Sequence, residues 1–354
     1  INRNFTNKIN KEETKALWRQ CAEQFKQVGD PVQAARALTN LSVHLERSEE
    51  REQIIRDCIG IFKERQSYFG LTLALNNLAY VVVNARGDYE EANLLLEEAI
   101  TIERQRNHSF RLVWWLNAFG HNLICQGEYV RAELNFKEAL ALSQSYDLGR
   151  GIIRPEEALC GLGRLSFLQR NYPEAERHLN EALELNMING DPHQTAHTLN
   201  ILCKLALARG QFTEARAFCS RVKIELDHAP QRSLDWIERN LAHLNNLAEL
   251  ELAQDNTRSA ARHLHTALQL SQKWEVLPIQ LELLLSFTDL LVKRGETKEA
   301  AKLLSFIVNH KGSTFATKEA AREQLQLYSD ALKKQGLKQA KSLGLEQVVA
   351  NILA

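Results

Sequence analysis

The sequence predicts an all-α protein, a right-handed superhelical solenoid of about seven to eight antiparallel helix pairs. Three observations support this fold class. Ala, Leu, Glu, Gln and Arg abound, whereas the 354 residues hold only 16 Gly and 6 Pro, a composition typical of long helices. One turn motif recurs six times at nearly constant spacing. The apolar residues around each turn follow the period of a helix face.

The recurring turn separates the two helices of each pair. Glycine at its first position permits the positive φ that ends a helix, while Asp88 and Asn171 can cap the helix that follows. Pro173 suits the first turn of a helix, and Asp191 with Pro192 offers the same combination at a later start. The motif begins at residues 87, 127, 170, 210, 255 and 295, so its copies are 40 to 45 residues apart, and reads GDYEEA, GEYVRA, RNYPEA, GQFTEA, DNTRSA and GETKEA.

Small residues mark where the two helices of a pair are expected to cross. Each first helix holds an apolar-periodic stretch with a small residue, and each second helix has a large residue four positions after the alanine of the motif. A bulky residue at the crossing would force the helices apart. The crossing residues are Ser42, Ala79, Gly120, Gly163, Cys203, Ala248 and Thr288, and their partners on the second helices are Leu96, Phe136, Leu179, Cys219, Leu264 and Leu304.

This repeated pattern resembles the tetratricopeptide repeat family, in its variety with a period near 40 residues. The resemblance covers essentially the whole chain and implies one superhelical domain over residues 1–354. Within it, residues 11–65 are expected to form an N-terminal half-pair and a degenerate repeat, 68–310 six regular repeats, and 315–354 a capping helix pair. The terminal repeats are expected to be atypical because no neighbour covers them.

The composition excludes several classes of partner. The 44 basic and 44 acidic residues balance, so no net field attracts nucleic acid or an anionic membrane. No apolar run approaches the roughly 20 residues that a membrane-spanning helix needs, and no secretory signal opens the chain. Six cysteines without a C-x-x-C pair indicate reduced thiols. We therefore expect a cytoplasmic protein that binds no nucleic acid directly and no membrane.

The known catalytic and cofactor motifs do not occur. The chain has no G-x-x-x-x-G-K-[ST] loop, no G-x-G-x-x-G fingerprint, no H-E-x-x-H helix and no G-x-S-x-G elbow. The pairs His193/His197 and His263/His265 have no Cys or carboxylate set at ligand spacing. We therefore expect no catalytic residue, no metal and no cofactor, in a protein that is not an enzyme.

A row of asparagines is the first candidate for ligand binding. In a superhelix of this type, the first helix of each pair lines the concave wall. Three positions before the crossing residue, four of the seven helices carry an asparagine, namely Asn76, Asn117, Asn200 and Asn245. A carboxamide both donates and accepts, so this row can hold the backbone of an extended peptide, as the resemblance to related arrays implies. The alternative is that each asparagine bonds the neighbouring repeat and serves packing.

Charged and aromatic residues share this wall. The groove is expected to be basic and aromatic in its middle and acidic in its C-terminal third, with Glu282 in the acidic part. Such a groove suits a ligand with acidic groups at one end and basic groups at the other, and the alternative is ordinary solvated charge. Helix neighbours diverge by about 100°, so Trp114 is the binding candidate and Trp115 the core one. The candidate ligand residues besides the asparagines are Tyr80, Trp114, His121, Arg164, His197, Lys204, Glu249 and Asp289.

The C-terminal part carries a second resemblance. Residues 310–317 (HKGSTFAT) and 345–349 (LEQVV) resemble the C-terminal sensor region of bacterial STAND signal-transduction ATPases. The chain opens at Ile1 without Met, as expected for a piece of a longer protein. The resemblance implies a sensor that binds a protein or peptide inducer and inhibits an upstream nucleotide-binding module through intramolecular contact. The alternatives are a freestanding adaptor that clamps an extended peptide, and a regulator that responds to a pheromone or small molecule.

Overall fold

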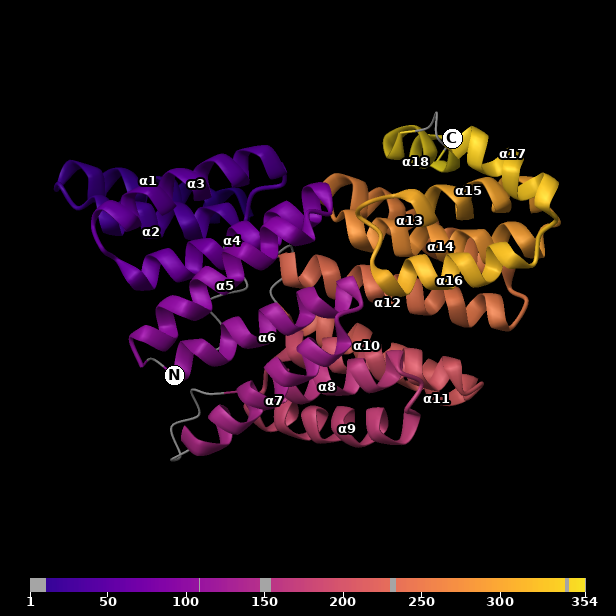
Figure 1. Cartoon of the computed structure of the whole chain (residues 1–354), viewed down its shortest axis with the longest axis horizontal. Helices are drawn as coiled ribbons and strands as arrows, with labels where there is room; N and C mark the ends of the chain where they lie inside the picture. The colour runs from indigo at the N-terminus through magenta and orange to yellow at the C-terminus, as the bar shows by residue number, and fades with distance from the viewer. Residues whose placement is uncertain (1–10, 108, 147–153, 230–233, 341–343, 354) are drawn as a thin grey trace.

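The computed structural model describes residues 11–107, 109–146, 154–229, 234–340 and 344–353, which form helices joined by short turns (Figure 1). From α1 to α16 each helix packs against the next, and no strand occurs within these ranges, which confirms the predicted all-α solenoid. The helices are α1 (Lys11–Gln27), α2 (Pro31–Ser42), α3 (Ser48–Glu64), α4 (Tyr68–Arg86), α5 (Tyr89–Gln105), α6 (Ser109–Gln126), α7 (Tyr129–Tyr146), α8 (Pro155–Leu168), α9 (Tyr172–Asn189), α10 (Pro192–Ala208), α11 (Phe212–His228), α12 (Leu234–Ala253), α13 (Thr257–Trp274), α14 (Leu277–Lys293), α15 (Thr297–Asn309), α16 (Phe315–Gln326), α17 (Asp330–Ala340) and α18 (Leu345–Leu353).

Close helix crossings hold the regular pairs together. A Cβ atom on Gly120 of α6 would lie 2.7 Å from the ring of Phe136 on α7. A Cβ atom on Gly163 of α8 would lie 2.6 Å from Cγ of Leu179 on α9. The backbone of each first helix therefore touches the large residue of its second helix, and these crossing positions admit only small side chains.

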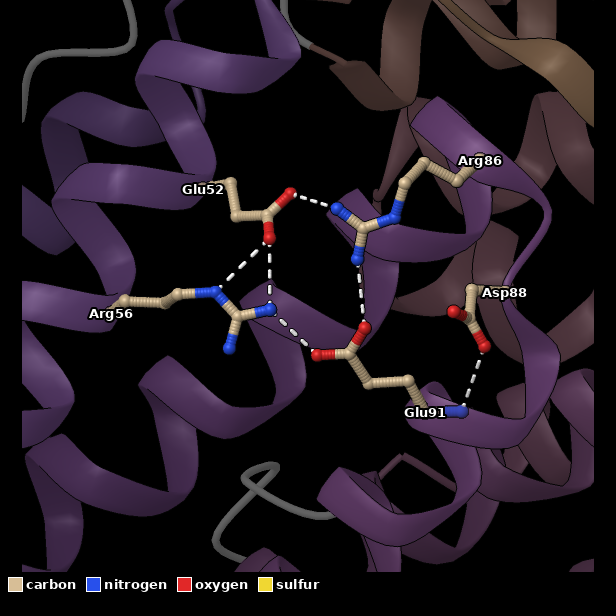
Figure 2. Close-up of polar contacts among 5 residues, drawn as sticks. All are labelled: Glu52, Arg56, Arg86, Asp88 and Glu91. Carbon is tan, nitrogen blue, oxygen red and sulfur yellow. Dashed lines mark hydrogen bonds and ion pairs between the residues drawn. The ribbon is translucent and has the colours of Figure 1, made fainter.

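A network of ion pairs joins the degenerate repeat to the first regular one (Figure 2). Glu52 of α3 binds both Arg56 of α3 and Arg86 of α4, at 2.8 and 2.5 Å. Glu91 of α5 binds the same two guanidinium groups at 2.6 and 2.7 Å. Asp88 caps α5 by accepting a hydrogen bond from the Glu91 N–H at 3.0 Å. Three helices are thus tied by one alternating network, which fixes geometry better than an isolated surface pair.

The C-terminal end differs from the expected capping pair, because three helices follow α15. The chain leaves α16 at Gln326, and the hydroxyl of Ser329 then accepts a hydrogen bond from the N–H of Leu332 at 3.5 Å. This capping interaction starts α17, which packs on α15, while α18 packs on α13. Residues 327–329 therefore separate α16 from an additional helix, α17, which precedes α18.

The array curves until its C-terminal helices meet its N-terminal ones (Figure 1). Helix α14 contacts α4, and α16 contacts α6. A carboxylate oxygen of Glu275 accepts a hydrogen bond from the backbone N–H of Ser48, in the first turn of α3, at 2.6 Å. The Tyr89 O–H donates to the carbonyl oxygen of Gly312 at 3.1 Å. The repeats between these contacts form a closed ring.

The turns before α5 and α7 approach the segment between α15 and α16 very closely. A Cβ atom on Gly87 would lie only 2.1 Å from Cα of Gly312, so the two backbones touch. The ring of Phe315 lies over Gly127 and meets the ring of Tyr129 at a centroid distance of 5.8 Å. We call the contacts made by Glu275, Gly312 and Phe315 with α3, α5 and these two turns the ring seam.

Candidate ligand-binding site

The first helices of the regular pairs line the inner face of the ring. Helices α6, α8, α10, α12 and α14 each contact the next first helix in this series, so their inward residues form one continuous wall. Three of the predicted asparagines, Asn117, Asn200 and Asn245, are buried. The other predicted residues are half-buried, namely Asn76, Tyr80, Trp114, His121, Arg164, His197, Lys204, Glu249 and Asp289.

Curvature brings residues of distant repeats into contact on this face. The Tyr80 O–H of α4 donates to a carboxylate oxygen of Glu238 on α12 at 2.5 Å. The rings of His121 and His197 lie 6.3 Å apart at their centroids. Glu238 was missed by the sequence analysis, although it lies seven residues before Asn245 and therefore on the same helix face. Extending the asparagine register by two turns would have found it.

Two members of the asparagine row are engaged by the protein itself. Asn200 is 3% exposed, and its side-chain amide donates to the backbone carbonyl of Arg239 at 3.0 Å. Its Oδ1 accepts a hydrogen bond from Asn246 at 3.1 Å. Asn245 donates to the Glu249 carboxylate one turn further along α12, at 2.9 Å. For Asn200 the packing interpretation therefore holds, because both ends of its amide bond the next repeat.

Asn117 differs from these two. Its side chain is 0% exposed, and neither its amide nitrogen nor its amide oxygen has a hydrogen-bond partner among the described residues. Its amide also acts on the Glu157 carboxyl of α8 as a weak hydrogen-bond donor, outside normal hydrogen-bond geometry, and so opposes the rise in the pKa of that group. Burial nevertheless raises the pKa of Glu157 to about 7. An unpaired carboxamide next to a carboxyl group that titrates near neutrality is the main polar feature of this wall.

The expected separation of charge along the groove is corrected by the structure. Lys204 of the basic middle forms an ion pair with Glu282 of the acidic part, 78 residues later in the chain. Burial raises the pKa of Glu249 above its usual value, and the Lys204 ammonium opposes part of that rise. The ring brings the two blocks of opposite charge together, so they neutralise each other instead of facing opposite ends of a ligand.

The two histidines of the wall are neutral at physiological pH. Burial and the guanidinium groups of Arg164 and Arg239 lower the pKa of His121 from 6.5 to about 3. Burial and the same groups, with His121 itself, place the pKa of His197 well below its usual value. A neutral imidazole both donates and accepts a hydrogen bond, and the buried Nδ1 of His121 has no partner among the described side chains.

Acidification is expected to destabilise the protein through His121. Its pKa is lowered in the folded state, so between pH 6.5 and about 3 the unfolded chain binds a proton that the folded chain does not. Stability is therefore lost as the pH falls through this window, by about 1 kcal/mol at pH 5 after allowance for partial exposure. Thermal unfolding at pH 7 and pH 5 should show a larger fall in Tm for the wild type than for His121→Gln.

Glu157 supplies the control for this experiment because its shift has the opposite sign. Its pKa is raised to about 7, so the folded chain holds the proton more tightly and gains stability as the pH falls from 7. Glu157→Gln removes that gain and should enlarge the fall in Tm at pH 5. Equal falls in the wild type and in His121→Gln would contradict the assignment.

Within the described ranges, no group of three or more His, Cys, Asp and Glu side chains is arranged to hold a metal ion. One described helix, α4 (Tyr68–Arg86), is long and apolar enough to span a membrane by composition alone. It packs between α3 and α5, and 56% of its apolar window is buried, as in the core helix of a globular array.

Comparisons with known proteins agree with this architecture. A family model described as tetratricopeptide repeat matches residues 71–108. No curated protein matches the chain by sequence. The apo form of RapI is similar in structure, with a TM-score of 0.58 and 14% identity, over 76% of this chain and 94% of that one.

Two complexes share the same fold. A Rap protein with competence and sporulation factor has a TM-score of 0.56 and 11% identity, over 97% of this chain and 99% of that one. A Rap conjugation gene regulator of a plasmid, with the Phr* peptide, has a TM-score of 0.54 and 12% identity, over 95% and 98%. At such low identity these likenesses concern the fold. Residues 71–108 thus match a tetratricopeptide repeat, and the succession of packed helix pairs shares the fold of these helical repeat proteins.

Proposed function

We propose that the inner face of the ring binds a peptide, or a peptide segment of a protein, and that the chain is a regulatory binding module rather than an enzyme. One observation carries this proposal. Asn117 is wholly buried in the wall, and its amide makes no hydrogen bond of normal geometry among the described residues beyond a weak interaction with the Glu157 carboxyl. A peptide group offers the complementary acceptor and donor, so a bound backbone would satisfy both atoms once local opening of the wall exposes this side chain.

An unpaired buried amide is energetically costly. Leaving such a group without partners costs about 1–3 kcal/mol, and buried polar groups of native proteins are normally paired. Asn200, at the same register one helix pair beyond α8, is fully paired and shows that this fold can satisfy an amide internally. The unsatisfied state of Asn117 therefore supports a role toward a ligand. Proteins of the same fold have been described with a peptide or with another factor bound, which agrees with this proposal.

Residues beside Asn117 define the chemistry of the ligand around that amide. The Glu157 carboxyl and the neutral imidazole of His121 offer an acceptor and a donor–acceptor pair. Lys204 of the wall is paired with Glu282, and Glu249 and Asp289 accept hydrogen bonds from neutral side chains. We therefore expect recognition through backbone and polar groups of the peptide rather than through a strongly charged sequence.

Replacing Asn117 by leucine is expected to weaken peptide binding at least about tenfold, because two hydrogen bonds to the ligand are lost. Its Tm should stay the same or rise, since a buried unpaired amide disappears. The measurement starts from a phage-displayed random peptide library selected on the wild-type protein. The affinity of a selected synthetic peptide is then compared between wild type and variant by calorimetry.

Asn200→Leu is the matched control. It should lower Tm, because the carbonyl of Arg239 loses its donor, while peptide affinity of the folded fraction is retained. The proposal fails if the library yields no binder to the wild type, or if Asn117→Leu lowers Tm and leaves affinity unchanged. A compact small molecule as the natural ligand would appear as competition with the selected peptide.

We further propose that the module regulates a STAND-type ATPase in the cytoplasm. This proposal rests on the resemblance of residues 310–317 and 345–349 to STAND sensor regions. Residues 312 and 315 of the first segment belong to the ring seam, so a ligand that changes the ring would also move this segment. The coding sequence upstream of Ile1 tests it. A strand followed by G-x-x-x-x-G-K-[ST] is expected, and a start codon close to Ile1 would instead favour a freestanding adaptor.

A further inference from the structure

Two buried thiols meet inside the fourth regular repeat. Cys203 of α10 and Cys219 of α11 are 0% and 2% exposed, and their Sγ atoms lie 3.2 Å apart. Cys203 Sγ also lies 3.4 Å from the carbonyl oxygen of Ala215. The imidazole of His243, from the following repeat, interacts with the thiol of Cys219. Two sulfurs and an imidazole are therefore gathered at one point of the core.

The repeat architecture explains why the thiols touch. Cys203 occupies the crossing position of its first helix, and Cys219 occupies the position of the large partner on the second helix. In the second regular repeat the same two positions hold Gly120 and Phe136, and the aromatic ring fills the space against bare backbone. With cysteine on both sides, the helix crossing brings two short side chains together. The 3.2 Å between the two Sγ atoms leaves a short movement to the roughly 2.05 Å bond of a disulfide.

Two other buried cysteines have different surroundings. The thiol of Cys58 donates to the carbonyl oxygen of Ala35 at 3.3 Å, and burial raises its pKa. Cys160 lies 3.6 Å from the hydroxyl of Thr198, and burial raises its pKa to about 11.

At the crossing, the sulfur–sulfur hydrogen bond with Cys203, in which either thiol can donate, and the interaction with His243 lower the pKa of the Cys219 thiol. The same hydrogen bond raises the pKa of Cys203. Cys219 is thus the thiol of the pair that is more easily deprotonated, and the thiolate is the form that reacts with oxidants.

We propose that Cys203 and Cys219 form a redox modification site, in which a hydroperoxide converts the two thiols into a disulfide that ties α10 to α11. The Cys219 thiolate attacks one oxygen of hydrogen peroxide, the O–O bond breaks, and hydroxide leaves to be protonated as water. The Cys203 sulfur then attacks Sγ of the Cys219 sulfenic acid, and its proton leaves with the hydroxyl group as a second water. Two thiols and one peroxide give one disulfide and two waters.

The position of the pair links this site to the inner face. Lys204 follows Cys203 directly and forms the ion pair with Glu282 of α14. A disulfide at residue 203 therefore fixes α10 immediately behind that wall position. Because both sulfurs are buried, peroxide reaches them through local opening of the repeat, and oxidation is expected to be slow.

The test compares reduced and peroxide-treated full-length chain. Intact mass spectrometry should show the loss of two hydrogen atoms, and peptide mapping should find Cys203 linked to Cys219. The cross-link closes a short loop between adjacent helices, so oxidation should raise Tm by about 5 °C, and a thiol reductant should reverse the rise. Hydrogen exchange in α10 and α11 should slow in the oxidised protein.

Cys203→Ala and Cys219→Ser should abolish both the mass loss and the rise in Tm. Cys203→Ala introduces the residue that Ala79 and Ala248 provide at the same position of their repeats, so the fold is expected to be kept. Cys160→Ser, with an equally buried sulfur, should leave both effects intact. A disulfide between other cysteines, oxidation to sulfinic acid without a cross-link, or an unchanged mass after prolonged peroxide treatment would overturn the proposal.

Discussion

Replacing Arg111 by alanine is expected to cost about 3–5 kcal/mol of unfolding free energy, because it leaves a buried carboxylate without its counter-ion. Glu103 of α5 has a side chain that is 0% exposed, and Arg111 of α6 binds it at 3.1 Å. The hydroxyl of Thr72 donates to the same carboxylate at 2.8 Å and cannot replace a full charge. The guanidinium of Arg111 also lies over the ring of Phe69 at 5.0 Å, and this contact is lost as well. Urea unfolding followed by circular dichroism measures the change.

Arg104→Ala is the matched control for this measurement. Arg104 lies on the same helix as Glu103, but both it and its partner Glu138 are largely exposed, and their ion pair is expected to contribute at most about 1 kcal/mol. The double variant Glu103→Leu/Arg111→Met should recover much of the loss, since an apolar pair needs no counter-ion. Equal effects of the two arginine variants would show that Glu103 is solvated or protonated in the folded chain.

Gly87→Ala is expected to open the ring seam. Gly87 has a φ of 64°, and a Cβ atom there would lie 2.1 Å from Cα and 2.8 Å from N of Gly312, which are backbone atoms and cannot turn aside. The left-handed conformation costs alanine about 1–2 kcal/mol, and the overlap must in addition separate the end of α4 from the segment between α15 and α16. Small-angle scattering should show a larger radius of gyration, and limited proteolysis should cut faster near residue 312.

Gly210→Ala separates the two effects. Gly210 occupies the corresponding turn of the fourth regular repeat with a φ of 71°, and no atom lies within 4 Å of the position of a Cβ atom. The unfolding free energy of this variant should fall by the same cost of the left-handed backbone. Its radius of gyration should equal that of the wild type. If both glycine variants give the same scattering curve, the seam does not hold the ring closed in solution.

Contacts within a repeat were predictable from the sequence. The spacing of Gly120 and Phe136, or of Gly163 and Leu179, identified the helix crossings because these residues are close in the chain and obey the helix period. The N-cap of Asp88 was predictable for the same reason, since it depends on only a few neighbouring residues. Local physics and the repeat period therefore specify the pairs.

Contacts across the ring were not predictable, because they depend on the accumulated curvature of many repeats. The rotations between successive helix pairs add up, and their total decides whether Lys204 meets Glu282 or faces solvent. No single repeat determines this total. The asparagine register shows the same limit. It placed Asn117 and Asn200 at the same position of two first helices, and both are buried there. Whether such an amide bonds the next repeat depends on whether that repeat presents a carbonyl, as Arg239 does to Asn200.

Closure of the ring changes how this solenoid should come apart. In an open array, each repeat contacts only its neighbours, so unfolding begins at the ends and proceeds inward in small steps. Here the α4 and α14 repeats also contact each other, and the repeats between them have no free end. Unfolding any one of them breaks the interfaces on both of its sides. Its chain remains attached at both ends and therefore gains little conformational entropy. The enclosed repeats are therefore expected to unfold as a single cooperative unit, with α1 and α18, which lie outside the cycle, fraying first.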